Sequence, residues 1–338
     1  MYVRCSRTTY IHIAYKEAGT LNGNLRFNTD INTRLHKHSG RLKKNIIRDK
    51  YLMLLVLPVV IYYIIFKYIP IGGILIAFQD YLPSSGFFES EWVGFKWFMQ
   101  FFNSIYFTRL IRNTFLISLN SLIWGFPIPI FFALMLNETK DGIYKRSVQT
   151  ISYLPHFVSL VIIVGMLTDI VSSQGVLNRL VQLVGGQSVD YIRSNQWFRT
   201  LYIVSGIWQS FGWNSIIYLA AITGISSELY EAATVDGANR FRRIWHITLP
   251  GILPTLVILL IMNCGRMFAV GSEKIILMYS PIVYETGDVI STYVYRRGIL
   301  GADYSFSAAV DLFNNSINFI LLLLVNYISK RVTETSLW

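Results

Sequence analysis

Residues 113–136 have the sequence NTFLISLNSLIWGFPIPIFFALML, which contains no aspartate, glutamate, lysine or arginine. A helix that spans a bilayer needs ~20 mostly apolar residues, so this stretch is long enough to cross a membrane. Five other stretches have the same character: residues 51–78 (interrupted by one lysine), 147–168, 200–227, 244–265 and 312–329. The chain is therefore predicted to be an all-α polytopic membrane protein with six transmembrane helices.

The composition agrees with a membrane protein. Hydrophobic residues make up 53% of the 338 positions and charged residues only 14%, against about 25% in an ordinary soluble domain. Such a sequence is too apolar for a disordered chain and has too few charges to cover the surface of a soluble enzyme. The net charge of +11 does not indicate a nucleic-acid binder, because the basic residues lie in a polar tail and between apolar runs.

The distribution of lysine and arginine predicts the orientation. Six spans place both termini on one side of the membrane. The segments on that side are 41–50, 137–150, 228–243 and 330–338, and together they hold thirteen lysines and arginines. The segments on the other side, 79–112, 169–199 and 279–311, are together twice as long and hold eight. Because positive charge is retained inside, both termini are expected in the cytoplasm.

The predicted organisation has three parts: a polar, basic cytosolic tail (residues 1–50), a six-helix transmembrane domain (51–329) and a cytosolic C-terminal tail (330–338). No small-residue cleavage site follows the first apolar run, so a cleaved signal peptide is not expected. Cys5 and Cys264 lie in the tail and in an apolar run, and they are expected to be unpaired thiols.

The sequence lacks the motifs of the common enzyme classes. It has no Walker loop, no His-Glu-x-x-His pair and no Gly-x-Ser-x-Gly elbow, so the chain is not expected to hydrolyse ATP or to catalyse another reaction itself. The histidines are His12, His36, His38, His156 and His246. Their positions favour structural or interfacial roles over metal binding. No catalytic residue, metal site or cofactor of its own is predicted.

The most informative hydrophilic segment runs from Glu228 to Pro250 and reads ELYEAATVDGANRFRRIWHITLP. Residues 228–235 favour a short helix, and Gly237 follows where a helix would end and the chain would turn. Three arginines make the next stretch basic, while Phe241, Ile244 and Trp245 recur at helical spacing and form an apolar face. The 228–250 loop is therefore predicted to form two short helices with a glycine bend between them.

This loop contains Glu-Ala-Ala, three residues, Gly, nine residues and Ile-x-Leu-Pro. The matching positions are Glu231, Ala232, Ala233, Gly237, Ile247, Leu249 and Pro250. The pattern resembles the cytosolic coupling loop of permease subunits in binding-protein-dependent type I ABC importers. The alternative for the same residues is an amphipathic loop that lies on lipid headgroups.

The resemblance extends from Tyr51 to Trp338 and is greatest to the complex-carbohydrate branch, the alginate and rhamnogalacturonan type. The segments that carry it are 66–70, 77–81, 92–94, 112–114, 137–138, 152–157, 284–298 and 334–338. There are two departures. Residues 1–40 do not match the usual short basic start, and Arg266 stands where a small residue is expected.

The resemblance implies a type I importer permease fold in a bacterial cell membrane. It implies a second homologous permease, two ABC ATPase subunits that bind ATP and Mg²⁺, and an extracellular solute-binding lipoprotein that delivers an oligosaccharide. Glu231, Ala232 and Ala233 would dock on an ATPase, and Gly237 would permit the bend. Arg242 and Arg243 would either pair with acidic residues there or anchor the loop to anionic lipid.

The expected fourth span carries candidate substrate-pathway residues. Phe211, Asn214 and Tyr218 share one helical face, and Gln209 and Trp213 share a neighbouring stripe. Asn263 in the fifth span is a similar candidate. Aromatic faces with amide groups suit a saccharide, although tryptophan and tyrosine in membrane helices also pack or lie at interfaces.

Ionisable residues near the spans are expected to pair with one another. Within spans such residues usually face protein or water. Arg266 is therefore expected to contact Asp169 or Glu273 rather than substrate. The long outer segments 79–112 and 279–311 are expected to meet the binding lipoprotein.

The predicted function is that of the permease subunit of an ATP-driven ABC importer for oligosaccharides or polysaccharide fragments. The alternatives are a secondary transporter or channel that works without ATPases, and a membrane scaffold that transports nothing. The 228–250 loop favours the importer, because a secondary transporter has no ATPase to dock.

Overall fold

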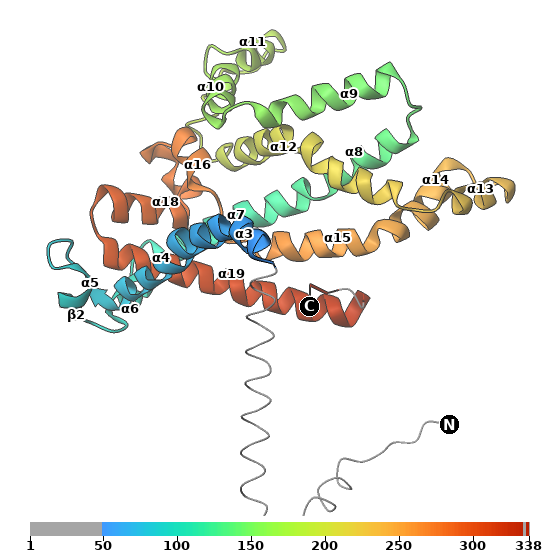
Figure 1. Ribbon diagram of the computed structural model, residues 1–338. Coiled ribbons are helices and arrows are strands. Elements are labelled where there is room, and N and C mark those ends of the chain that lie inside the picture. Colours follow the sequence, from blue (N-terminus) through green and yellow to red (C-terminus); the bar gives the residue numbers. More distant parts are fainter. Residues whose placement is uncertain (1–48, 334–335, 338) are drawn as a thin grey trace, which may run out of the picture. The chain divides into compact units, whose positions relative to one another are not determined.

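The computed structural model describes residues 49–333, 336 and 337. It consists almost entirely of helices (Figure 1), as the sequence predicts. The chain forms two units, Met1–Gly72 and Gly73–Trp338, and each is described by itself. Most of the predicted N-terminal tail (1–50) and residues 334, 335 and 338 of the predicted C-terminal tail lie outside the described residues.

The described part of the first unit is one helical run. It consists of α3 (Lys50–Tyr63), the π-helix η1 (Ile64–Tyr68) and α4 (Ile69–Ile71). Pro58 lies inside α3, and Pro70 lies in the first turn of α4, where a missing amide proton is tolerated. Apart from Lys50 and Lys67, the side chains of this run are apolar or aromatic on all sides, and none is buried. A helix of this kind suits a lipid environment.

The second unit begins within the 3₁₀-helix η2 (Gly72–Phe78) and continues with a two-stranded antiparallel sheet. The strands β1 (Gln79–Asp80) and β2 (Glu91–Trp92) flank α5 (Gly86–Glu89). Then follow α6 (Lys96–Phe102), α7 (Phe107–Gly125), α8 (Pro127–Glu138), α9 (Ile143–Tyr153), η3 (Leu154–Phe157), α10 (Leu160–Val171), α11 (Val176–Leu183) and α12 (Phe198–Thr223).

The C-terminal part of this unit contains the remaining helices. They are α13 (Ser227–Val235), α14 (Arg240–Arg243), η4 (Ile244–Thr248), α15 (Leu249–Cys264), α16 (Ser272–Met278), η5 (Pro281–Val283), α17 (Tyr284–Gly287), α18 (Ile290–Val294), η6 (Tyr295–Leu300) and α19 (Tyr304–Thr333). The short helices α13 and α14 lie at one end of the unit, and α5, α16 and α18 lie towards the other (Figure 1). The helical run from Arg240 to Cys264 is unbroken.

Among the described residues, five helical runs are long and apolar enough to cross a membrane. They are Lys50–Phe78, Phe107–Glu138, Leu160–Leu183, Arg240–Cys264 and Tyr304–Val332. The predicted fourth span is present as α12, whose 26 residues extend about 39 Å at 1.5 Å per residue. Gln209, Asn214 and several serines make α12 more polar than the other five. The structure is therefore that of a multi-pass membrane protein.

The predicted third span, 147–168, is wrong as a single helix. The helix α9 ends at Tyr153, and Val158 and Ser159 are extended before α10 begins at Leu160. Pro155 lies in the intervening 3₁₀ turn, and the Ser159 side chain caps α10 by accepting a hydrogen bond from the Ile162 amide (3.4 Å). The lack of charged residues in 147–168 indicates an apolar stretch, but it does not indicate that this stretch forms one continuous helix.

The helix α12 links two of the three buried clusters in the unit. Near its start, Phe198 packs in a cluster with Ile275 and Val289. Near its end, Tyr218 packs in a cluster with Ile252. Inside a membrane, such contacts depend on close van der Waals packing, because lipid is as apolar as the side chains. Among the polar residues of α12, Ser205 and Ser215 are buried, Gln209 is half-buried and Asn214 is exposed.

The chain between α15 and α16 is not helical, and two buried asparagine side chains from α19 form hydrogen bonds with its backbone. The side chain of Asn318 accepts a hydrogen bond from the Phe268 amide (2.7 Å), and Asn314 donates one to the Phe268 carbonyl (3.1 Å). These two side chains lie one turn apart on α19. They satisfy irregular backbone that hydrocarbon would leave unpaired.

The contact between α12 and α9 depends on a glycine. A Cβ atom on Gly212 would lie 2.2 Å from the carbonyl oxygen of Ser152, which is backbone and cannot rotate away. We expect Gly212→Ala to lower the melting temperature of the purified protein by several degrees, because overpacking costs about 1–3 kcal/mol. Gly165→Ala is the matched control, since its Cβ would meet no atom within 4 Å. Equal melting temperatures for the two variants would contradict this packing.

Candidate functional site

A polar cavity of about 470 Å³ lies beside α12. Its walls come from α7, α8, α12, α15 and the segment that leads into α16. Four of the six predicted pathway residues line it: Gln209, Asn214, Tyr218 and Asn263. The helices α7 and α12 add the hydroxyls of Ser118, Ser121 and Ser210. Gln209, Asn214 and Tyr218, which come from the two predicted stripes of α12, therefore border an open space.

Two predicted pathway residues do not line the cavity. The ring of Phe211 packs edge-on against Phe132, with the centroids 5.0 Å apart. The indole of Trp213 stacks on His156 at 4.7 Å, with only 3° between the ring planes. The structure shows no substrate path, so the pathway role of Phe211 and Trp213 stays a prediction, although neither residue lines this cavity. His156 thus contacts a neighbouring ring, and its structural or interfacial role stays a prediction.

The hydrogen-bonding groups of the cavity are only partly satisfied by the protein. Asn263 donates to the Leu259 carbonyl (2.8 Å), and Gln209 makes a long contact with the Val158 carbonyl (3.4 Å). The buried hydroxyl of Ser118 has no hydrogen-bond partner among the described residues. These groups can exchange hydrogen bonds with a polar ligand.

Two cationic residues also line the cavity, Arg266 and Lys274. Arg266 makes no ion pair with Asp169 or Glu273 among the described residues, so the predicted pairing is wrong. A contact between Arg266 and Glu273 would need one continuous helix, because residues seven positions apart lie on the same helical face. The helix α15 ends at Cys264, however, and Glu273 belongs to α16 after a turn. Lys274 was not singled out from the sequence.

The 228–250 loop forms the first short helix and the glycine bend that the sequence predicts, whereas the second predicted short helix is the start of the continuous run from Arg240 to Cys264. Gly237 follows α13 with φ of +75°, which favours glycine. The Ala238 amide donates to the Ala233 carbonyl (2.8 Å), and the Gly237 amide donates to the Thr234 carbonyl (3.1 Å). This is the Schellman arrangement that ends a helix. The Asn239 side chain then caps α14 by accepting from the Arg242 amide (2.9 Å).

Side-chain contacts hold the 228–250 loop to itself and to α8. They are Tyr230 with Thr248 (Oη to Oγ1, 3.0 Å), Arg243 with Thr234 (Nη1 to Oγ1, 3.1 Å) and Arg240 with Glu138 (Nε to Oε2, 4.0 Å). Glu231, Ala232 and Arg242 are exposed, while Ala233 and Arg243 are half-buried. The stacked rings of Phe241 and Trp245 are 72% and 61% exposed, so a broad apolar surface faces outward.

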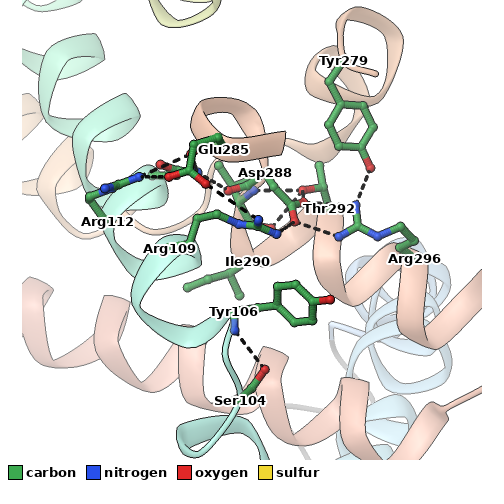
Figure 2. A network of polar contacts seen from close by, with 12 residues as sticks. Ser104, Tyr106, Arg109, Arg112, Tyr279, Glu285, Asp288, Ile290, Thr292 and Arg296 are labelled. Carbon is green, nitrogen blue, oxygen red and sulfur yellow. Dashed lines mark hydrogen bonds and ion pairs between the residues drawn. The ribbon is translucent and has the colours of Figure 1, made fainter. Parts of the chain in front are cut away.

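A network of charged residues joins α7 to the 284–296 segment at the opposite end of the unit (Figure 2). Its centre is the fully buried carboxylate of Asp288. Arg296 donates two hydrogen bonds to it, at 2.8 and 3.1 Å, and the Thr292 hydroxyl donates a third at 2.8 Å. Arg109 lies 3.5 Å away, and Arg112 pairs with the exposed Glu285 at 2.7 Å.

The pKa values of two groups in this network follow from burial and charge. Burial by itself lowers the pKa of Arg296, but the hydrogen bonds and charge of Asp288 outweigh it and raise the pKa above its ordinary value. Burial raises the pKa of Tyr279 to about 12, and the nearby Arg296 opposes this only in part. Both groups therefore keep their protons at neutral pH.

Asn113 ties three elements together beside this network. Its side-chain amide donates to the carbonyls of Glu285 (3.0 Å) and Asp288 (2.9 Å), and its oxygen accepts from Arg199 of α12 (2.7 Å). The next residue, Thr114, accepts a hydrogen bond from the Ile290 amide (3.1 Å). The sequence marked 112–114 only as part of the family resemblance, because the partners lie more than 80 residues away.

Comparison with known proteins gives consistent matches. The family described as "Binding-protein-dependent transport system inner membrane component" matches residues 125–334, a region that includes α12 and the 228–250 loop. Protein LplB of Bacillus subtilis is 43% identical over 86% of this chain and 92% of its own length. The polygalacturonan/rhamnogalacturonan transport system permease protein YteP of the same organism is 42% identical over 88% and 93%.

Solved structures match as well. A chain of a bacterial ABC transporter involved in the import of the acidic polysaccharide alginate has a TM-score of 0.81 and 44% identity, and the match covers 87% of this chain and 99% of that one. A second structure, of an alginate ABC transporter in complex with an alginate pentasaccharide-bound periplasmic protein, gives the same TM-score and identity over 88% and 100%. The chain thus belongs to the family of inner-membrane permease components of binding-protein-dependent transport systems.

Proposed function

We propose that this chain is the transmembrane permease subunit of an ATP-driven importer that moves oligosaccharides or polysaccharide fragments into the cytoplasm. The observation that carries the proposal is the cavity beside α12, which is lined by amides, hydroxyls and the ring of Tyr218. Its volume of about 470 Å³ lies within the usual range of small-molecule sites. The names of YteP and of the alginate transporters, which concern sugar polymers, support a saccharide substrate.

The 228–250 loop would couple transport to partner ATPases, which would bind ATP and Mg²⁺ in place of this chain. Its exposed apolar rings and the exposed start of the Glu231–Ala233 motif offer a docking surface. The continuous helix from Arg240 to Cys264 joins this surface to Asn263 at the cavity. With the loop on the side of the ATPases, both termini and the two predicted tails would lie in the cytoplasm.

The remaining partners would be a second homologous permease and an extracellular solute-binding lipoprotein. The lipoprotein would dock on the opposite end, where residues 79–112 and 279–311 lie. The structural relative in complex with a periplasmic protein supports a partner of this class. The network around Asp288 would give the docking end a fixed shape.

Reconstitution in vesicles tests the function. We expect the chain, assembled with the second permease, the ATPases and the binding protein, to take up an oligosaccharide at least tenfold faster with ATP than without it. The chain purified alone is expected to hydrolyse no ATP, and a complex with inactivated ATPases is the control. Uptake driven by an ion gradient and indifferent to ATP would contradict the proposal and favour a secondary transporter.

A further inference from the structure

The helix α13 has little apolar packing to hold it in place. None of its residues is buried, and Leu229 and Val235 are 54% and 89% exposed. The backbone joins α13 to the helical run Arg240–Cys264 through residues 236–239, which include the bend at Gly237. A helix attached in this way would turn easily about the bend. Its orientation to the run therefore depends on polar contacts.

Four residues form a closed ring of hydrogen bonds between α13 and this run. The Thr234 hydroxyl donates to the Tyr230 carbonyl (2.7 Å) and accepts from Arg243 (Nη1 to Oγ1, 3.1 Å). The Thr248 hydroxyl lies 3.0 Å from the Tyr230 hydroxyl and makes a long contact with the Arg243 carbonyl (3.5 Å). Each of the four thus contacts two others. We call this ring the clamp, and its members are Tyr230 and Thr234 of α13 and Arg243 and Thr248 of the run.

The directions of the hydrogen bonds in the clamp follow from the groups involved. A carbonyl can only accept, so Thr248 donates its single hydroxyl proton to Arg243. The Tyr230 hydroxyl must then donate to Thr248, which has lone pairs left to accept it. Replacing Tyr230 by phenylalanine would therefore remove a donor that nothing else in the clamp supplies.

The clamp also spans the irregular turn near the start of the run. Thr248 is fully buried and ends the π-helix η4, and Arg243 immediately precedes this helix. Pro250 follows two residues later and has no amide proton to donate. Helices bend most readily at π turns and prolines. A link between Arg243 and Thr248 therefore braces the run at a place where it would otherwise yield.

The two neighbouring arginines of the loop differ in their surroundings. Arg242 is exposed, whereas Arg243 is half-buried. Arg243 uses Nη1 in the clamp, and its buried Nε atom has no hydrogen-bond partner among the described residues. Arg242 is therefore the better candidate for an external partner, and Arg243 for a contact within the chain.

We propose that the clamp fixes α13 against the start of the run, so that a movement of α13 reaches the cavity instead of being absorbed at Gly237. Its members would be positioning residues for transport, because none of them has to touch an ATPase or the sugar. This inference rests on the proposed coupling role of the 228–250 loop. It adds the side chains that connect the docking helix to the helix that borders the cavity.

The test measures the amount of sugar taken up per ATP hydrolysed, in vesicles that contain the complete importer. The probe is a galacturonate pentamer presented by the binding protein. Tyr230→Phe removes one hydroxyl and keeps the ring, and Thr248→Val removes the other and keeps the branched shape. Each is expected to lower the ratio of uptake to ATP hydrolysis about fivefold, the size expected for the loss of one hydrogen bond. ATP hydrolysis itself is expected to stay close to that of the unmodified importer.

Three further variants sharpen the test. Thr248→Ser keeps the hydroxyl and is expected to keep the ratio. Tyr144→Phe also loses a phenol hydroxyl, but Tyr144 lies on α9 and is 73% exposed, so its ratio is expected to equal that of the unmodified importer. The double variant Tyr230→Phe/Thr248→Val is expected to be no worse than the poorer single variant, because both changes remove the same hydrogen bond.

An unchanged ratio in both single variants would overturn the inference and leave the proposed function intact. If uptake and ATP hydrolysis fell together, the clamp would only stabilise the fold, and the inference would be wrong. Tyr230 is half-buried, so Tyr230→Phe gives an answer even if Thr248→Val does not fold. An unmodified importer without ATP-driven uptake would remove the proposed function, and the inference with it.

Discussion

Replacing Gly237 with valine is expected to reduce ATP-driven uptake at least tenfold while the subunit remains in the membrane. Gly237 has φ of +75°, and a Cβ atom there would meet nothing within 4 Å. The obstacle is therefore conformational rather than steric, because a β-branched residue is strongly disfavoured in the left-handed region. Valine would break the Schellman arrangement and change the angle between α13 and α14, so the docking surface would lose its shape.

Gly237→Asn is the matched control for this prediction. Asparagine tolerates the left-handed region better than other non-glycine residues and is also found at helix ends of this type. We expect the asparagine variant to keep most of the uptake, and both variants to be present in the membrane fraction in normal amounts. If valine and asparagine supported equal transport, the bend at Gly237 would have no role in coupling.

Removing the carboxylate of Asp288 is expected to be the most destabilising single change in the chain. Asp288 is fully buried and holds Arg296 and Arg109, whose side chains are 27% and 24% exposed. The variant Asp288→Ala would leave both guanidinium groups without this partner, and breaking a buried pair in this way costs about 3–5 kcal/mol. We expect a large fall in the melting temperature of the detergent-purified protein, with little folded material at 37 °C.

Glu285→Gln provides the comparison for Asp288→Ala. Glu285 belongs to the same network, but its side chain is 58% exposed, and surface pairs contribute at most about 1 kcal/mol. The melting temperature of the Glu285→Gln variant is expected to stay within a few degrees of that of the unmodified protein. A similar fall in melting temperature in both variants would show that the burial of Asp288 does not determine the stability of this charged network.

The features that the sequence predicted well are those encoded by neighbouring residues. The bend at Gly237 and the helices beside it depend on caps and hydrogen bonds within about a dozen positions. Long apolar runs likewise indicated the spans, because each helix that crosses the bilayer must itself be long and apolar enough to do so. The break at Val158 escaped prediction because composition measures apolarity rather than continuity.

The features that the sequence did not predict depend on residues far apart in the chain. Asp288 meets Arg109, and Lys274 meets the Tyr202 carbonyl 72 positions away. Helical periodicity grouped Phe211 with Asn214, but only packing against α8 shows that the phenyl ring turns away from the cavity. Contacts of this kind become visible only once the helices are assembled.

The unbroken helix from Arg240 to Cys264 has a mechanical consequence. Its 25 residues correspond to a strut of about 37 Å, and the far end of this strut carries Asn263 at the cavity. The run includes the π-helix η4 and Pro254, where helices can bend, but it contains no turn or extended residue. A tilt of the strut at its arginine-rich foot is therefore expected to displace Asn263 as well. Spectroscopic labels attached at the two ends of this helix should therefore report the same conformational change with a single time constant.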